Sequence, residues 1–456
     1  MATAPAEDPE LEARTLRNVR RRLLPFLCLL YFVAYLDRVN VGFASLQMNA
    51  ALGLSAWAYG LGAGIFFIGY FLFEVPSNLV LQRVGARLWI ARIVFFWGLV
   101  SCAMAWTVGP RSFWALRFLL GVAEAGFYPG VLLYLTYWFP ARHRAKAVAQ
   151  FATASMFAFI VGGPLSGLLL SLRGRGGLDG WQWLFVIEGL PAVLLGFVVL
   201  LYLTDRPEDA AWLADDERAW LSETMARERQ AQGAPHGSVR DGLLDPGVWR
   251  LAFTFLLLVV SAYGFSFWLP QLLKGLSGAS DLKVGLLTAL PYAVAAVGMV
   301  LIASHSDRTG ERRWHVAGAA LTATTGFVIA ALAPHPLLTF AGLCVAALGA
   351  YGSTPPFWSL PTSFLRGTAA AAGIALINSV GNLGGFMGPF VLGTVEKLTG
   401  SFMGGLFFLT SCMALSSITV FWLGRSDVAG SGRGAEDVKP SPPLVKPGKI
   451  GAETTP

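Results

Sequence analysis

The sequence predicts an all-α polytopic membrane protein, with twelve transmembrane helices in two pseudo-symmetric six-helix bundles. Hydrophobic residues make up 55% of the chain and charged residues 13%, and the mean hydropathy is +0.58. A soluble domain carries roughly 25% charged residues. A helix needs about 20 apolar residues to span a membrane, and twelve such stretches can be read along the 456 residues. Short motifs also recur between the two halves of the chain.

The apolar stretches divide the chain into five parts. The expected spans lie near residues 23–46, 56–81, 88–108, 112–138, 146–171, 182–203, 250–273, 284–304, 313–333, 336–358, 368–395 and 401–424. They predict an N-terminal tail (1–22), an N-terminal bundle (23–204), a linker (205–249), a C-terminal bundle (250–424) and a disordered C-terminal tail (425–456). In the linker, Trp212 and Trp220 lie among charges, which predicts a helix on the inner membrane surface.

The distribution of Lys and Arg predicts the orientation. Cytoplasmic loops are enriched in these residues, and most of the 34 fall on one side of the expected spans. We therefore expect both termini in the cytoplasm of a cell whose inner membrane holds the protein. The net charge of +7 is explained by this membrane face, so no nucleic-acid partner is expected. The loops on the other side hold only Arg111, Arg173, Arg175, Lys274, Lys283 and Lys397.

Two pairs of motifs share one spacing. Gly85 and Gly310 are 225 residues apart, as are Pro164 and Pro389, and a glycine precedes each proline. This spacing predicts a duplicated six-helix unit, and transporters built from such repeats bind substrate between them. The loops around Gly85 and Gly310 are expected to form an inner gate, in which Arg caps helix ends or pairs with Asp307 and Glu74. The alternative is simple anchoring by positive charge. The expected gate residues are Arg83, Gly85, Arg87, Asp307 and Arg308.

Four charged residues lie inside the apolar stretches: Asp37, Arg38, Arg117 and Glu124. A charge near the bilayer centre costs at least ~2.5–3.5 kcal/mol, so such residues usually face a water-filled cavity. The helical rise places Arg38 roughly 22 Å from the inner edge of a core roughly 30 Å thick, and Arg117 roughly 8 Å from the outer edge. The two guanidiniums therefore share a level and can hold a carboxylate between them.

The two acids are expected to carry protons. Glu124 follows Arg117 by seven residues, on the same helical face about 10 Å deeper, and Asp37 points about 100° away from Arg38. With both acids ionised the four charges sum to zero, whereas protonating either acid leaves a net positive charge that favours an anion. Proton and anion binding then reinforce each other. The alternative is two structural ion pairs.

These residues belong to motifs that resemble the anion:cation symporter family of the major facilitator superfamily. The motifs are YLDRVNVG (35–42), EVPSN (74–78), RFLLGVAEAG (117–126), WLFVIEG (183–189) and NSVGNLGG (378–385). The resemblance covers roughly residues 20–425 and implies the major facilitator fold. It also implies a bacterial importer of tartrate, phthalate, sugar acids or similar anions. The second half looks most like tartrate or related dicarboxylate transporters.

The resemblance implies a role for eight residues. Asp37 and Glu124 match the protonation sites of sugar-acid members, and Arg38 and Arg117 match arginines that bind the anion. The residues implied to line the substrate site are Tyr35, Tyr70, Trp358 and Asn378. Polar contacts of the sugar-acid members are missing around Ser155 and Gly381, which favours a smaller or more apolar anion. Trp358 follows Pro355 and Pro356, so we expect the tenth span to be broken there.

The sequence excludes several other classes of protein. It contains no HExxH, GxSxG or Walker motif, so no enzyme or ATP-driven pump is expected. No metal site or disulfide is expected from its four cysteines, and the only coupling ion expected is the proton. We therefore expect a secondary transporter that acts as a monomer in the bilayer and imports an organic acid anion with protons by alternating access. An anion exchanger, a proton-coupled exporter and a non-transporting sensor remain the alternatives.

Overall fold

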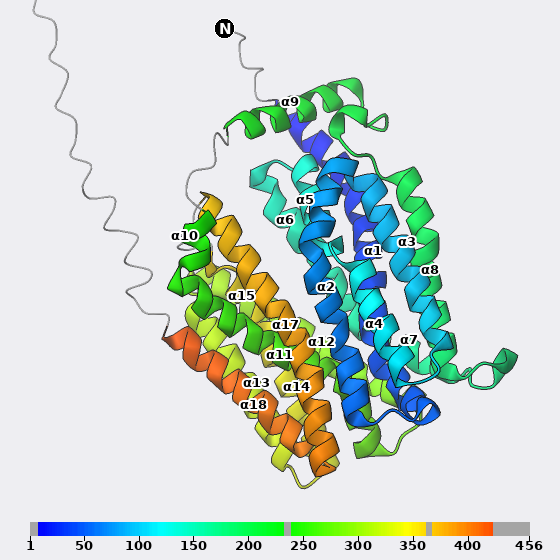
Figure 1. Ribbon diagram of the computed structural model, residues 1–456. Coiled ribbons are helices and arrows are strands. Elements are labelled where there is room, and N and C mark those ends of the chain that lie inside the picture. The colour runs from blue at the N-terminus through cyan, green and yellow to red at the C-terminus, as the bar shows by residue number, and fades with distance from the viewer. Residues whose placement is uncertain (1–7, 232–238, 362–366, 423–456) are drawn as a thin grey trace, which may run out of the picture.

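The first half of the chain forms eight helices that fill one lobe of the molecule (Figure 1). The computed structural model describes residues 8–231, 239–361 and 367–422. The helices of this lobe are α1 (Pro9–Leu52), α2 (Ala56–Val84), α3 (Ala86–Ala103), α4 (Pro110–Glu124), α5 (Phe127–Trp138), α6 (Ala141–Ala152), α7 (Ala154–Leu170) and α8 (Gly180–Tyr202).

The second half fills the other lobe, and a linker joins the two. The linker contains the 3-10 turn η3 (Pro207–Asp209) and the helices α9 (Asp215–Ala231) and α10 (Val239–Leu244). The helices of the second lobe are α11 (Pro246–Ser277), α12 (Asp281–Thr309), α13 (Arg313–Leu332), α14 (Pro336–Gly352), α15 (Thr354–Trp358), α17 (Gly367–Thr399) and α18 (Met403–Phe421). Twelve stretches among the described residues are long and apolar enough to cross a membrane, as predicted.

The two lobes repeat more than the sequence motifs indicated. Gly53 and Gly278 end α1 and α11 in the left-handed conformation, with φ of 62° and 60°. Two residues later, Ser55 and Ser280 cap α2 and α12 by accepting a backbone N–H. Both pairs are 225 residues apart, which is the spacing of the Gly85 and Gly310 pair. The same cap chemistry at one spacing supports a duplicated six-helix unit.

Three of the expected spans are interrupted. In the fourth, α4 ends at Glu124 and α5 begins at Phe127, because Ala125 leaves the helical conformation and Gly126 has a φ of 87°. The fifth divides at Thr153 into α6 and α7. The tenth divides at Ser353, where α14 gives way to α15, and this confirms the break expected near Pro355 and Pro356. Broken helices are tolerated where the freed backbone groups are buried in protein or face water.

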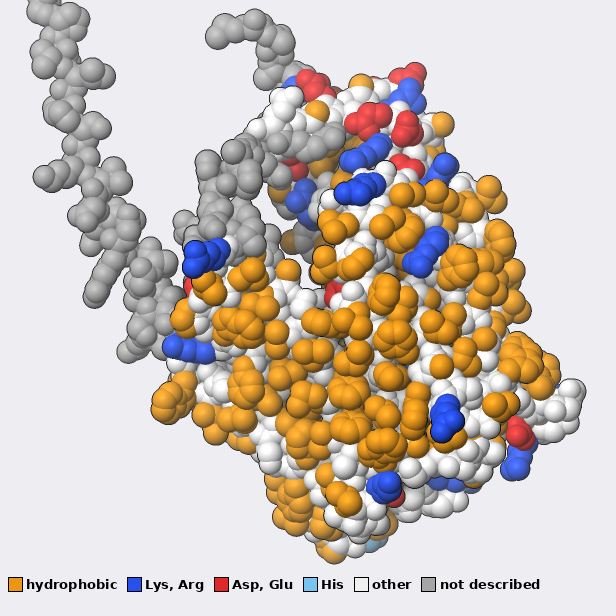
Figure 2. Space-filling model, in the orientation of Figure 1, with side chains coloured by type: hydrophobic (Ala, Val, Ile, Leu, Met, Phe, Trp, Pro, Cys, Tyr) orange, Lys and Arg blue, Asp and Glu red, His pale blue; other side chains and the backbone are white. Residues whose placement is uncertain are grey.

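The lobes pack tightly at the end of the molecule away from α9. Here α2 crosses α17 and α7 crosses α12. A Cβ atom on Gly60 would lie 2.5 Å from the carbonyl oxygen of Pro389, and one on Gly163 would lie 2.1 Å from the Thr288 hydroxyl. The Tyr59 hydroxyl also donates to the carbonyl of Phe267 at 2.9 Å. Towards α9, by contrast, the surface is hollowed between the lobes (Figure 2).

The α9 end of the first lobe is held by ion pairs, and two details there differ from the sequence prediction. Residues 9–22, expected as a tail, continue α1, which Asp8 caps. The apolar side chains of the linker helix contact protein instead of lipid, since Leu221 and Met225 are buried. Arg14 of α1 pairs with Asp216 and Glu217 of α9. The N-terminal part of α1 therefore holds α9 of the linker against the first lobe.

Close contact between α2 and α4 yields the first prediction. A Cβ atom on Gly121 would lie 2.0 Å from the carbonyl oxygen of Phe66, which is backbone and has little freedom to move. Gly121→Val should therefore lower the free energy of unfolding by about 1–3 kcal/mol through overpacking. Thermal unfolding of the purified protein in detergent measures this loss. Gly318→Val, where no atom lies within 4 Å, is the matched control, and equal melting of the two variants would contradict the prediction.

Candidate functional site

Arg38 of α1 lies among aromatic rings and contacts both lobes. One terminal nitrogen forms an ion pair with Glu124, and the other donates to the Tyr263 hydroxyl of α11 at 3.2 Å. The guanidinium carbon lies 5.0 Å from the ring centroid of Tyr35, 5.4 Å from Phe66 and 5.6 Å from Tyr70. Cation–π contacts of this kind stabilise a charge that has lost its water. The side chain nevertheless keeps 11% of its surface exposed.

The contact with Tyr263 locates Arg38 between the two repeats. Tyr263 follows Arg38 by 225 residues, so the two are equivalent positions of α1 and α11. Residues related by a two-fold axis touch each other only when both lie beside that axis. The pseudo-symmetry therefore places this charge at the centre of the molecule, where transporters with repeats bind substrate.

Glu124 is the last residue of α4, next to the helix break at Ala125 and Gly126. Its side chain is 2% exposed and accepts a hydrogen bond from Arg38. A helix end leaves carbonyl groups without intrahelical partners, so the break introduces further polar groups beside the acid. The sequence showed the small residues around Glu124 but not the break, because Gly within an apolar stretch is also compatible with close helix packing.

Arg117 is fully buried and binds backbone. Its Nε donates to the carbonyl of Gly62 and one terminal nitrogen to that of Ala63, both at 3.2 Å. The other terminal nitrogen is buried without a hydrogen-bond partner among the described residues. Its guanidinium lies 5.0 Å from the ring of Phe66, the ring that Arg38 also contacts. The two guanidiniums thus contact the same aromatic side chain, and of the two only Arg38 forms an ion pair with an acid among the described residues.

Asp37 faces away from Arg38, into the first lobe. Its carboxylate accepts hydrogen bonds from Asn40 at 3.0 Å, from the Trp97 indole at 2.7 Å and from the Ser101 hydroxyl. All three donors are neutral, and the side chain is 1% exposed. Among the described contacts of Asp37 there is no ion pair, so the alternative of two structural ion pairs fails for this acid.

The aromatic residues expected at the site are only partly together. The rings of Tyr35 and Tyr70 both face Arg38, and Tyr35 also packs against Phe159 with centroids 5.5 Å apart. Trp358, at the end of α15, packs against Phe255 with centroids 4.8 Å apart. It has no contact with the arginine among those that the structure describes.

Asn378 meets an acid that was expected elsewhere. We expected Glu74 to pair with the Arg residues at the inner loops, and this was wrong. The Glu74 carboxylate accepts one hydrogen bond from Asn378 and one from Asn382, each at 3.2 Å. The two amides lie one turn apart on α17 and converge on α2. Their contact joins the two lobes.

The expected gate residues lie at the α9 end of the molecule. Asp205, which the sequence analysis missed, accepts the backbone N–H of Arg87 at 2.8 Å and lies 2.9 Å from where a Cβ atom of Gly85 would stand. In the second lobe Asp307 pairs with Arg312 at 2.5 Å. Arg83 and Arg308 are exposed.

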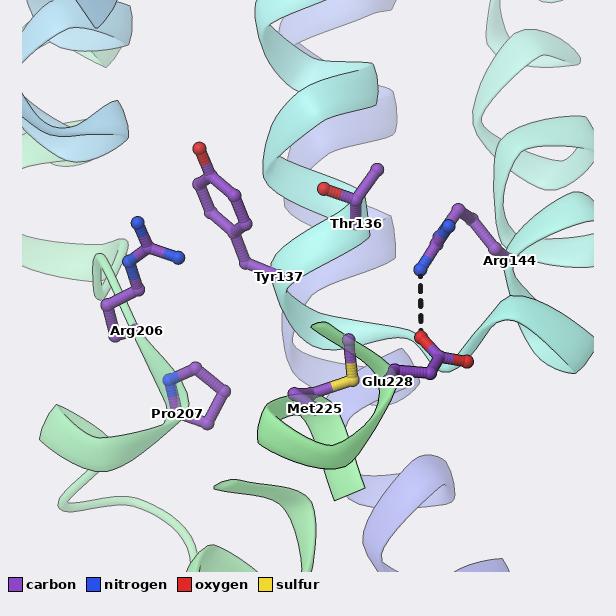
Figure 3. A pocket seen from close by; sticks show the side chains of 7 residues that line it. All are labelled: Thr136, Tyr137, Arg144, Arg206, Pro207, Met225 and Glu228. Atoms are coloured by element: carbon purple, nitrogen blue, oxygen red, sulfur yellow. Dashed lines mark hydrogen bonds and ion pairs between the residues drawn. The ribbon is translucent and has the colours of Figure 1, made fainter. Parts of the chain in front are cut away.

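Apart from the central charges, a separate cavity of about 190 Å³ lies beside α9, between Met225 and Glu228 of that helix and Tyr137 of α5 (Figure 3). In it the Arg206 guanidinium stacks on the Tyr137 ring at 3.9 Å, and Arg144 bonds to Glu228 at 3.2 Å. No group of His, Cys, Asp and Glu in the described part of the chain is arranged to hold a metal ion.

The chain is similar to known membrane transporters over most of its length. The model of the Major Facilitator Superfamily matches residues 27–389. A "Putative tartrate transporter" of Agrobacterium vitis is 52% identical over 424 residues, which cover 93% of this chain and 98% of that protein. A "Quinolone resistance transporter" of Acinetobacter baumannii is 45% identical over 413 residues, which cover 90% and 95%. Among solved structures, a bacterial homologue of the human lysosomal transporter Spinster, inward-facing and occupied, has a TM-score of 0.71. It is 17% identical and covers 93% of this chain and 99% of that chain, so this likeness concerns the fold.

The different partners of the two arginines predict opposite effects on stability. Arg117→Met removes a buried charge that has no acid beside it, so the variant should unfold at the same or a higher temperature than the wild type. Arg38→Met leaves Glu124 buried without its partner, which typically costs about 3 kcal/mol or more. Thermal unfolding at pH 8, where carboxyl groups retain their charge most readily, measures both. A larger loss for Arg117→Met than for Arg38→Met would contradict this assignment.

Proposed function

The chain belongs to the Major Facilitator Superfamily, and from this we propose that it imports an organic acid anion together with protons by alternating access. It is a multi-pass membrane transporter and not an enzyme. The observation that carries the proposal is the ion pair of Arg38 and Glu124, which lies within the first lobe where Arg38 also contacts Tyr263 of the second. A removable proton on the acid decides whether the arginine is free for an anion.

Glu124 is the first proton site of the proposal. An ionised Glu124 occupies Arg38, and a substrate carboxylate at the same nitrogen would have to displace it. A protonated Glu124 has lost the charge that holds Arg38, and the guanidinium then prefers an incoming carboxylate. Anion binding thus requires the proton, and by linkage a bound anion favours the protonated acid.

Asp37 is the second proton site of the proposal. Burial disfavours a charged carboxyl group, whereas hydrogen bonds to its charged form favour it. Three donors favour the charged form of Asp37, while its burial opposes that form. The charge of Asp37 also interacts with Arg117. A proton on Asp37 therefore removes negative charge that would otherwise offset the Arg117 guanidinium. Each proton therefore makes the centre more attractive for an anion.

The substrate class follows from these groups and from the relatives. Two guanidiniums that both contact Phe66 give this region the positive charge that an organic anion requires, and the rings of Tyr35 and Tyr70 leave apolar walls with polar edges. A small dicarboxylate such as tartrate matches this combination, and relatives over nearly the whole chain carry that name. We therefore propose a tartrate-like acid as the substrate.

The movement proposed is a rocking of one lobe against the other. The lobes pack on glycine at the end away from α9, and the surface is hollowed towards α9. With most Lys and Arg on the α9 side, that end is assigned to the cytoplasm. The conformation is then open to the inside of a bacterial inner membrane, with both termini cytoplasmic and the chain acting as a monomer.

The proposal predicts a separation of binding from coupling. Glu124→Gln should keep exchange of the anion across proteoliposomes but lose accumulation under an imposed proton gradient, because the amide cannot give up a proton. Arg38→Ala should abolish both. Uptake of radiolabelled tartrate, with and without an inward proton gradient, measures the difference. Glu217→Gln, which removes a buried acid at the α9 end of the molecule, is the control. Accumulation by Glu124→Gln under a proton gradient would refute the coupling role.

A second candidate function is proton-coupled export. The relative named for quinolone resistance favours it, since the same acids could drive an exchange of protons for substrate. Cells that produce the protein should then tolerate a quinolone at concentrations several-fold higher, and Glu124→Gln should remove that tolerance. Under the import proposal we expect no change in tolerance, while tartrate uptake rises as the external pH falls. Growth inhibition and uptake assays on the same strains distinguish the two.

A further inference from the structure

Glu74 has no part in the function proposed above, yet it is buried at the interface of the two lobes. Its side chain is 7% exposed. It lies on α2 one turn beyond Tyr70, whose ring faces Arg38. An acid in this position needs strong donors, because a buried carboxylate without them is costly. Its donors come from the opposite lobe.

Those donors form a small anion-binding site. Asn378 and Asn382 are four residues apart, so their amides lie on one face of α17. Each donates to a different oxygen of Glu74 at 3.2 Å. Two N–H groups on the two oxygens of one carboxylate are what a substrate carboxylate would also require.

The arrangement repeats the one at Arg38. There, Glu124 occupies a donor that the family resemblance assigns to the substrate. Here, Glu74 occupies Asn378, which the same resemblance assigns to the substrate. In both places a glutamate of the first lobe thus accepts hydrogen bonds that the substrate would otherwise accept.

The surroundings of Glu74 leave its charge poorly compensated. The Arg38 guanidinium of α1 is close enough to interact with the charge of Glu74. Tyr70 lies on α2, the same helix as Glu74. The part of α17 that packs here, 372–395, contains no ionisable side chain, and α5 contributes only tyrosines. Glu124 at the end of α4 adds a second negative charge near Tyr70. In the described structure, Glu74 therefore depends mainly on the two amides.

We propose that Glu74 is a resident carboxylate that holds Asn378 and Asn382 in the empty carrier and yields them to a carboxylate of the substrate. The inference rests on the proposed function. When the substrate takes the amides, the contact between α2 and α17 opens, so binding itself loosens the lobes. A proton on Glu74 converts one acceptor oxygen into a donor and weakens its hold on the amides. Glu74 then acts as a further acid through which low pH promotes anion binding.

The test compares tartrate affinity at two pH values. Glu74→Gln keeps the size of the side chain but removes its charge. This variant should bind radiolabelled tartrate about fivefold or more tightly than the wild type at pH 8.0. At pH 5.5 the two should bind equally, because the wild-type acid is then more often protonated. Binding to the purified full-length protein gives both values, and Glu74→Ala carries the same expectation if the glutamine variant is unstable.

Two comparisons separate this inference from a general effect of charge. Glu217→Gln removes another buried carboxyl group, which accepts from Asn18 at 2.8 Å at the α9 end of the first lobe, and it should leave the affinity at pH 8.0 unchanged. Equal affinity and pH dependence in Glu74→Gln and the wild type would overturn the role of Glu74 while leaving the proposed function in place. No binding or uptake of tartrate or any other organic acid by the wild type would overturn both.

Discussion

The structure depends on a charge pair that the membrane makes expensive. Arg38 lies within α1 and Glu124 at the end of α4, in helices whose buried side chains are mostly apolar. Removing either charge would leave the other buried without its partner. The surrounding structure serves this pair. The break after Glu124 brings polar backbone next to it, and three aromatic rings cover the guanidinium. A pair that is costly to bury and easy to neutralise by one proton is suited to a switch.

Pseudo-symmetry explains why the pair of Arg38 and Glu124, the proposed proton switch, contacts both lobes. Arg38 and its equivalent Tyr263 touch at the axis, where the lobes remain close while their ends move apart. Contacts further from the axis, such as those of Gly60 and Gly163, must separate when the lobes rock. The hydrogen bonds between Glu74 and α17 lie beyond Arg38 as seen from Gly60, one turn past Tyr70 on α2. These hydrogen bonds can be replaced by hydrogen bonds to a ligand carboxylate. The van der Waals contacts of a glycine cannot be replaced in this way.

Much of this arrangement could be predicted from the sequence, but the pairing could not. Twelve spans followed from hydropathy, and the charges inside them marked the centre. The level shared by Arg38 and Arg117 also followed from helical rise, and both contact Phe66. Which acid meets which arginine depends on packing between helices far apart in sequence. Tyr263 and Asp205 were missed because an aromatic residue in a span and an acid in a charged linker carry no distinguishing pattern.

The charges at the centre also constrain the coupling that the proposed function requires. Two arginines and three buried acids, Asp37, Glu124 and Glu74, lie in this region, so it carries an excess of negative charge when all three acids are ionised. A dicarboxylate would add two more negative charges in a region where net charge is strongly penalised. Arg117, with one nitrogen unpartnered, offsets only part of this. Under the proposal, the binding of a dicarboxylate therefore has to be accompanied by uptake of more than one proton, and the acids for it stand on either side of Arg38.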